Sequence, residues 1–181
     1  MNIPNLITIA RILLVPVTIW LLISDEYLLA FSIFILAGVS DAADGWLARA
    51  TNTQSELGAY LDPLADKALL VSTYAALGVL RLVEPWLVIT VISRDVLIIG
   101  ALLLSRFMDR PVAVNPLRIS KANTLIQIIF VGLVLANLSF GQPPAVILEG
   151  VAILVAGFTL ASGAAYLRAW IAHMGGTRDR S

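Results

Sequence analysis

The sequence has no cysteine and little charge. Without cysteine the chain can form neither a disulfide nor a thiol-based active site, and the redox compartment stays undetermined. Charged residues make up 13% of the 181 positions and the formal net charge is zero, so no basic field favours a nucleic-acid partner. Linkers and low-complexity tracts are also missing, which predicts a single domain over residues 1–181.

Hydrophobic residues dominate what is present. They make up 59% of the chain, and the mean hydropathy is +0.91, which indicates an all-α polytopic membrane protein rather than a soluble domain. A transmembrane helix needs roughly 20 residues, and six stretches qualify. We predict a bundle of six transmembrane helices at residues 6–23, 28–49, 57–82, 86–104, 122–139 and 145–172.

Lysine and arginine fall mostly on one side of this predicted bundle. Such residues concentrate on the cytoplasmic side of membrane proteins. The other side offers only Arg81, beside Asp25, Glu26 and Glu84. We therefore expect both termini to face the cytoplasm. The basic residues on that side are Arg49, Arg106, Arg110, Arg118, Lys121, Arg178 and Arg180.

Four carboxylates lie in the second and third predicted spans. Asp41 and Asp44 are three residues apart, and Asp62 and Asp66 are four apart, so each pair shares one helix face. The polar link at residues 50–56 is short and predicts an antiparallel hairpin. Positions equidistant from a hairpin turn lie at the same depth, so all four carboxylates can converge just inside the cytoplasmic interface.

Such a cluster favours a metal ion. Four neighbouring anions cannot all stay ionised without compensation, and hard oxygen ligands suit Mg²⁺ or Mn²⁺. The alternative, four solvated carboxylates near helix ends, is disfavoured because charged groups within a membrane are costly.

Further polar residues repeat along the predicted spans. Asn5 and Thr8 belong to a stripe in the first span that either snorkels to the interface or faces the carboxylates. Gly45 and Gly58 allow close helix packing or close approach of a substrate. Ala48 extends that small surface, and Arg49 ends its helix where it could bind a phosphate. 

Two basic residues elsewhere are candidates for substrate contacts. Arg94 and Asp95 are adjacent in the fourth span, and we expect each to find its own partner on a neighbouring helix, as a structural ion pair or as a substrate contact. Lys121 recurs with Thr124 and Gln127 every three residues at the mouth of the fifth span, which makes Lys121 the best candidate for a substrate phosphate. The other loop cations suit lipid head groups.

The carboxylate stretch resembles the complete signature of the CDP-alcohol phosphotransferases. That family has six transmembrane helices and commonly forms homodimers, so the resemblance covers nearly the whole chain. It implies a bacterial inner-membrane enzyme that passes the phosphatidyl group of CDP-diacylglycerol to an alcohol and releases CMP. The eight matching positions over 26 residues are Asp41, Asp44, Gly45, Ala48, Arg49, Gly58, Asp62 and Asp66.

The resemblance also implies roles for these residues. Asp41, Asp44 and Asp62 would bind Mg²⁺ or Mn²⁺, while Asp66 would complete the metal site and act as general base on the acceptor hydroxyl. The residues expected to line the CDP pocket or hold the polar head group are Gly45, Ala48, Arg49, Gly58, Asn5 and Thr8.

The acceptor is predicted from shorter motifs. Residues 2–11 look like the start of both phosphatidylglycerophosphate synthases and CMP-forming cardiolipin synthases. The stretches at residues 92–96 and 119–124 look more like the cardiolipin synthases. Phosphatidylglycerophosphate synthases more often show an Arg-Glu pair where this chain has Arg94 and Asp95, and a Gly-Lys-x-Lys-Thr run in which Asn123 here replaces the second lysine. A doubly anionic acceptor such as glycerol-3-phosphate favours more fixed cations. We therefore predict phosphatidylglycerol as acceptor, contacted by Arg94, Arg118 and Lys121, with glycerol-3-phosphate as the alternative.

Other classes also place carboxylates in membranes. A divalent-cation transporter with a path lined by aspartate is the non-enzymatic alternative, but no second hydrophilic half of such a path is visible. Polyprenyl transferases need more spans, and intramembrane aspartyl proteases need only two aspartates. Metal-dependent release of CMP separates these classes from the main prediction.

Overall fold

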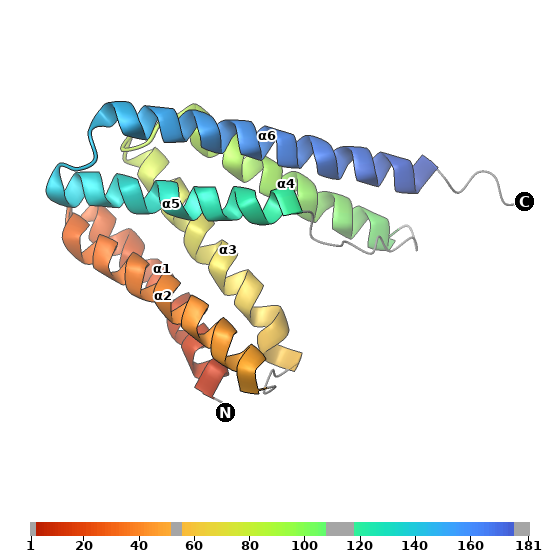
Figure 1. The fold of residues 1–181 in the computed structure, drawn as a ribbon, viewed down its shortest axis with the longest axis horizontal. Coiled ribbons are helices and arrows are strands. Elements are labelled where there is room, and N and C mark those ends of the chain that lie inside the picture. Colours follow the sequence, from red (N-terminus) through yellow and green to blue (C-terminus); the bar gives the residue numbers. More distant parts are fainter. Residues whose placement is uncertain (1–2, 52–55, 108–117, 176–181) are drawn as a thin grey trace, which may run out of the picture. The chain divides into compact units, whose positions relative to one another are not determined.

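The structure is a computed structural model that describes the backbone of residues 3–51, 56–107 and 118–175. Side chains are described at residues 10, 12–40, 67–101, 104–105, 107 and 119–171. These parts of the chain form six α-helices and no strand, which confirms the all-α prediction (Figure 1). The helices are α1 (Ile3–Ile23), α2 (Tyr27–Thr51), α3 (Glu56–Val79), α4 (Pro85–Phe107), α5 (Arg118–Phe140) and α6 (Ala145–Gly175).

Two helices end in the same capping motif. At the end of α3 the Leu82 N–H donates to the Leu77 carbonyl at 2.9 Å, and Arg81 adopts the left-handed conformation with φ 57°. Asp25, with φ 58°, occupies the equivalent position after α1. This is the Schellman arrangement, in which a left-handed residue lets the chain turn back and satisfy the last carbonyls. Arginine is not a typical residue for that position. Helix α3 ends at Val79, three residues before the predicted end of the third span.

Helix α5 begins four residues earlier than the predicted fifth span. Residues 118–121 form its first turn rather than the end of a loop. The Thr124 hydroxyl donates to the Ser120 carbonyl at 3.2 Å, a bond within the helix. Lys121 is therefore part of a helical turn.

The described residues group into two compact units. The first unit comprises Met1–Glu84 with Val131–Pro144, and the second comprises Pro85–Phe130 with Ala145–Ser181. Helix α5 contributes its second half to the first unit and its first half to the second. The prediction of one domain over residues 1–181 stays a prediction.

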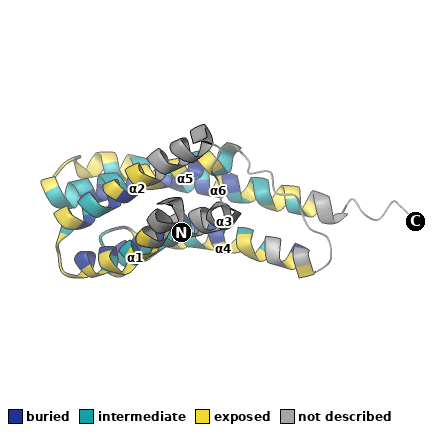
Figure 2. Cartoon of the chain, turned by 90° about the horizontal axis from the view of Figure 1, so that it is seen from below, coloured by how far each residue is buried: buried dark blue, intermediate teal, exposed yellow. Residues whose placement is uncertain are grey.

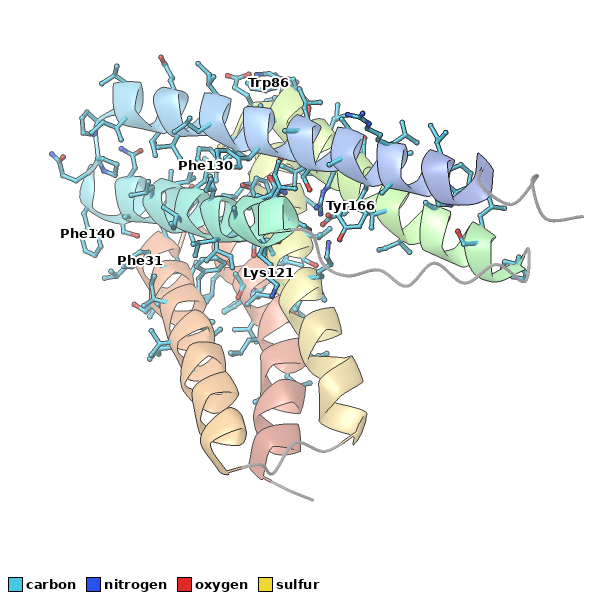
Figure 3. The ribbon with its side chains drawn as sticks, turned by 45° about the vertical axis from the view of Figure 1, so that its right-hand side comes forward. Phe31, Trp86, Lys121, Phe130, Phe140 and Tyr166 are labelled. Carbon is cyan, nitrogen blue, oxygen red and sulfur yellow. The ribbon has the colours of Figure 1, made fainter. Side chains whose placement is uncertain are left out.

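The first unit has an apolar core. Within it α1 packs against both α2 and α3, which lie beside it in Figure 1. Phe31 on α2 meets Phe140 on α5 edge to face, with ring centroids 5.7 Å apart (Figure 3). The two buried threonines donate to carbonyls of their own helices. The buried residues at the centre of this core are Leu21, Leu22, Ala30, Phe34, Leu69, Tyr74 and Leu77.

In the second unit α4 packs against α6, and part of the packing is polar. The Trp170 Nε1–H on α6 donates to Ser105 Oγ on α4 at 2.8 Å. The apolar side chains of Leu87 and Val91 on α4 and of Val155 on α6 are also buried.

Apolar side chains also cover the outside of the helices. Leu13, Leu36, Leu97 and Leu160 are all more than half exposed, and exposed positions run along the helices in Figure 2. Two helical segments are long and apolar enough to cross a membrane, Ile119–Phe140 and Ala145–Ile171. Three shorter apolar segments also occur, Ile12–Ile23, Tyr27–Ser40 and Lys67–Val79. These features fit a membrane protein, and by themselves they do not establish six spans.

Candidate functional site

The four predicted metal ligands lie on two helices that are consecutive in the chain. Asp41 and Asp44 belong to α2, and Asp62 and Asp66 belong to α3. With 3.6 residues per turn, each pair shares one face of its helix. The side chains lie outside the described residues, so the convergence of the four carboxylates stays a prediction. The same holds for Gly45, Ala48 and Arg49 on α2, for Gly58 on α3, and for Asn5 and Thr8 on α1.

The packing of the first unit supports a shared site at the level of helices. Because α1 contacts both α2 and α3, the helix that carries Asn5 and Thr8 is a neighbour of both helices that carry the aspartates. Among the residues with described side chains, no group of three histidine, aspartate or glutamate residues could hold a metal ion. The predicted ligands were not among those residues.

Arg94 lies at the centre of a buried polar network in the second unit. Its side chain is 5% exposed, and its Nη1 pairs with Asp95 Oδ1 at 2.6 Å. Its Nη2 donates to Ser120 Oγ on α5 at 2.7 Å and to Ser162 Oγ on α6 at 2.5 Å. Arg94 Cζ also lies 5.7 Å from the ring centroid of Tyr166, which provides a cation–π contact.

This geometry corrects one prediction. Arg94 and Asp95 pair with each other, although adjacent helical positions point in different directions. The length of the arginine side chain explains this, because its guanidinium group can bend back along the helix. Arg94 also reaches α5 and α6, as expected for a partner on a neighbouring helix. Its predicted contact with the acceptor stays a prediction.

A second group of polar side chains lies one turn further along α5. Thr159 Oγ1 on α6 donates to Asn123 Oδ1 at 2.9 Å, and Gln127 Nε2 donates to Thr159 Oγ1 at 3.2 Å. All three side chains are buried. Two donors of the network, Arg94 Nε and Asn123 Nδ2, have no hydrogen-bond partner among the described residues.

Lys121 differs from its neighbours in being exposed. It projects from the first turn of α5 (Figure 3), and no hydrogen bond or ion pair joins it to the described side chains. Gln127, which recurs with Lys121 and Thr124 every three residues, is buried. Six residues rotate a helix by well over one turn, so the positions of Lys121 and Gln127 diverge. The predicted contact of Lys121 with a substrate phosphate stays a prediction. The side chain of Arg118 lies outside the described residues.

The sequence carried a signal for the network that our predictions did not use. Ser120, Asn123 and Gln127 recur at helical spacing on α5, and Thr159 and Ser162 are three residues apart on α6. Polar residues at such intervals in apolar helices indicate hydrogen bonding between helices. What the spacing could not reveal is which helix each residue faces.

Comparison with known proteins places this signature in a family. The family model described as CDP-alcohol phosphatidyltransferase matches residues 1–171. The chain belongs to the CDP-alcohol phosphatidyltransferase family. All eight signature positions lie inside the match.

Relatives within the CDP-alcohol phosphatidyltransferase family carry two different names. A CDP-diacylglycerol–glycerol-3-phosphate 3-phosphatidyltransferase 1 (chloroplastic) of Oryza sativa subsp. japonica is 35% identical over 184 residues, covering 92% of this chain and 56% of that protein. Cardiolipin synthase (CMP-forming) of Homo sapiens is 35% identical over 181 residues, covering 91% and 60%. CDP-diacylglycerol–glycerol-3-phosphate 3-phosphatidyltransferase of Bacillus subtilis (strain 168) is 36% identical over 155 residues, covering 77% and 79%.

The chain thus spans little more than half the length of the rice and human relatives. Similarity at this level does not separate the two names, because both occur at about the same identity. The choice of acceptor therefore depends on residues of the site.

Proposed function

We propose that this protein is a membrane-bound phosphatidyltransferase that moves the phosphatidyl group of CDP-diacylglycerol to the hydroxyl of a glycerol-type alcohol and releases CMP. The observation that carries the proposal is the eight-position signature from Asp41 to Asp66, which lies on α2 and α3 and inside the family match. A chain of mostly apolar helices retains four aspartates there, where charged groups are costly without a function.

The proposed metal ligands are Asp41, Asp44, Asp62 and Asp66. Carboxylate oxygens are the ligands that Mg²⁺ and Mn²⁺ prefer, and two pairs at helical spacing fit a donor set shared by two helices. The bound ion would offset the charge of the pyrophosphate and stabilise CMP as the leaving group.

Asp66 also has a role in the transfer step, as the general base. Asp66 takes the proton of the acceptor hydroxyl, and the acceptor oxygen then forms a bond to the phosphorus of the phosphatidyl group. The bond between that phosphorus and the bridging oxygen of the pyrophosphate breaks, and this oxygen leaves with CMP, so a phosphodiester bond replaces a phosphoanhydride bond. Such chemistry depends mainly on positioning and charge stabilisation. We assign the CDP pocket to Gly45, Ala48, Arg49, Gly58, Asn5 and Thr8.

We propose phosphatidylglycerol as the acceptor. The stretches at residues 92–96 and 119–124 support it, and so does the human relative named cardiolipin synthase (CMP-forming). Arg118 and Lys121 would contact the acceptor phosphate at the start of α5, where Lys121 is exposed. The neutral Asn123 leaves that turn with fewer cations than a doubly anionic acceptor favours.

Glycerol-3-phosphate is the second candidate acceptor. The rice and Bacillus subtilis relatives are named as glycerol-3-phosphate phosphatidyltransferases, and the identity to this chain is equal or slightly higher. The mechanism and the aspartate assignments are the same for either acceptor.

We further propose that all six helices cross the bacterial inner membrane, with the termini and the aspartates on the cytoplasmic side, and that the protein is a homodimer. The helices are 21 to 31 residues long, and about 20 residues span a bilayer. Exposed leucines along them, including Leu36 and Leu97, suit contact with lipid. Because the chain has no cysteine, single cysteines can be introduced and labelled from either side of a vesicle to test the orientation.

A competition assay tests the proposed function. Purified protein in detergent micelles receives CDP-diacylglycerol, Mg²⁺ or Mn²⁺, and equal amounts of phosphatidylglycerol and glycerol-3-phosphate, and the lipid products and CMP are quantified. Cardiolipin with an equal yield of CMP is expected, and EDTA should abolish both. Phosphatidylglycerophosphate instead would select the second acceptor. Absence of CMP with both acceptors, while divalent ions cross the membrane of proteoliposomes, would favour the transporter.

A further inference from the structure

We propose that Arg94 is a positioning residue for the acceptor: it holds the first turn of α5 in place, and with it Lys121. This inference rests on the proposed function, which assigns the acceptor phosphate to Lys121. It replaces a direct contact between Arg94 and the acceptor with an indirect role that acts through Ser120.

The bonds of Arg94 show what it holds together. Nη1 pairs with Asp95 on its own helix, and Nη2 is shared by Ser120 on α5 and Ser162 on α6. One planar guanidinium therefore ties three helices of the second unit at a single level. A lysine ammonium at this position would keep the charge. It lacks the two terminal nitrogens with which the planar guanidinium bonds to Asp95 and to both serines at once.

The hydrogen bond from Arg94 to Ser120 lies in the first turn of α5, where a helix has the fewest internal hydrogen bonds. Ser120 is the third residue of α5, and the first N–H groups of any helix lack partners within the helix. Helix ends fray unless other contacts hold them. The bond from a buried cation to Ser120 Oγ supplies such a contact, and Thr124 closes the turn by donating to the Ser120 carbonyl. Lys121 follows directly, so its backbone position depends on that bond.

Burial argues against a direct contact between Arg94 and the acceptor. Both terminal nitrogens have protein partners, and the side chain is 5% exposed. Gly163 adds to the enclosure, because a Cβ there would lie 3.5 Å from Arg94 Cγ. A phosphate would have to displace existing bonds in a buried place, which is costly. The exposed cation beside it, Lys121, meets no such obstacle.

The test compares two serines that share the same Arg94 nitrogen. Ser120→Ala removes the hydrogen bond from Arg94 to α5. Ser162→Ala removes the hydrogen bond from Arg94 to α6 and leaves the bond to α5 intact. Ser139→Ala is the matched control, because Ser139 also lies on α5 but bonds only to the Leu135 carbonyl of its own helix. Steady-state kinetics in mixed micelles then give KM separately for CDP-diacylglycerol and for whichever acceptor the wild type uses.

We expect Ser120→Ala to raise the acceptor KM about 3- to 10-fold, the usual effect of one hydrogen bond, with KM for CDP-diacylglycerol unchanged. Ser162→Ala should change the acceptor KM less than twofold, like Ser139→Ala. Arg94→Lys should raise the acceptor KM at least as much as Ser120→Ala if it folds. Equal effects of Ser120→Ala and Ser162→Ala, or an unchanged acceptor KM in Ser120→Ala, would overturn the positioning role.

A spin label separates failure of this inference from failure of the proposed function. The chain has no cysteine, so Lys121→Cys gives a single labelling site without the replacement of any other residue. This variant lacks the proposed phosphate contact and reports only the motion of the turn. The nitroxide should move faster when Ser120→Ala is added and should be unaffected by Ser162→Ala. If the wild type released no CMP, the proposed function would fail while the label still reported whether Arg94 holds the turn. Unchanged nitroxide motion in the Ser120→Ala protein would refute the proposal that Arg94 holds the first turn of α5 through Ser120.

Discussion

The two units of this protein use polar residues in different ways. In the described part of the first unit the buried hydroxyls of Thr18 and Thr73 bond to carbonyls of their own helices, and most of the other buried side chains are aliphatic. In the second unit Arg94 and Thr159 bond to side chains of other helices. Bonds within a helix do not select its neighbours, whereas bonds between helices do.

This difference matches the proposed division of work. The first unit carries the four aspartates on α2 and α3, and α1 packs against both of these helices. The second unit uses its polar groups to hold α4, α5 and α6 in register, and it presents Lys121 at the edge. Four predictions test this comparison, from the largest expected effect to the smallest.

Loss of a carboxylate in the first unit should have the largest effect. Asp66→Asn is expected to lower the rate of CMP release at least about 100-fold, because an amide cannot take the proton of the acceptor hydroxyl. The folded protein should remain, as judged by thermal unfolding in detergent. Glu149→Gln on α6 is the control, since it makes the same change at an exposed position. Turnover of Asp66→Asn close to that of Glu149→Gln would remove the general-base assignment.

Shortening a core side chain tests whether apolar packing holds the first unit. Leu77 is 0% exposed on α3, so Leu77→Ala should lower the free energy of unfolding by about 2–5 kcal/mol. Leu36→Ala removes the same atoms from a side chain that is 64% exposed on α2, and we expect a much smaller change. Chemical denaturation monitored by tryptophan fluorescence measures both. Similar losses in the two variants would contradict the apolar core described for this unit.

One pair of threonines compares the two kinds of hydrogen bond directly. Thr159→Val should cost about 1–3 kcal/mol, because it leaves polar atoms of Asn123 and Gln127 buried without Thr159. Thr73→Val removes only a bond to the Leu69 carbonyl, which keeps its place in the helix, and should cost less than about 1 kcal/mol. The two residues are equally buried, at 0% and 1% exposure. The same unfolding assay applies, and a reversed order would show that the bonds between helices contribute little.

The smallest effect concerns the exposed end of the first unit. The Tyr27 hydroxyl donates to Asp25 Oδ1 at 2.5 Å, and this bond raises the pKa of Tyr27 above its usual value of 10.0. The stabilisation is therefore fully present below pH 10 and is lost as the pH rises through the raised pKa. Asp25→Asn should lower the pKa of Tyr27 toward 10.0, measured as phenolate absorbance against Tyr27→Phe. An unchanged titration would mean that Asp25 does not control Tyr27.

Much of the fold was predictable because apolar runs and their breaks are local properties. Each of the six predicted spans starts or ends within two residues of an observed helix boundary, and all six overlap a helix. The errors arose at ends decided by backbone conformation, as at Arg81, whose left-handed φ stops α3 early. The start of α5 at Arg118 was missed because polar residues there resemble a loop.

The sequence by itself determined the all-α class, the family signature from Asp41 to Asp66 and the class of chemistry that four carboxylates in apolar helices favour, because spacing along a helix fixes which residues share a face. Only the tertiary structure decided that Arg94 pairs with Asp95 and reaches Ser120 and Ser162, that Asn123 is buried, and that Lys121 remains exposed. The physical reason is that a polar residue in an apolar helix needs a partner, and only the packing of the helices determines which partner lies within hydrogen-bonding distance.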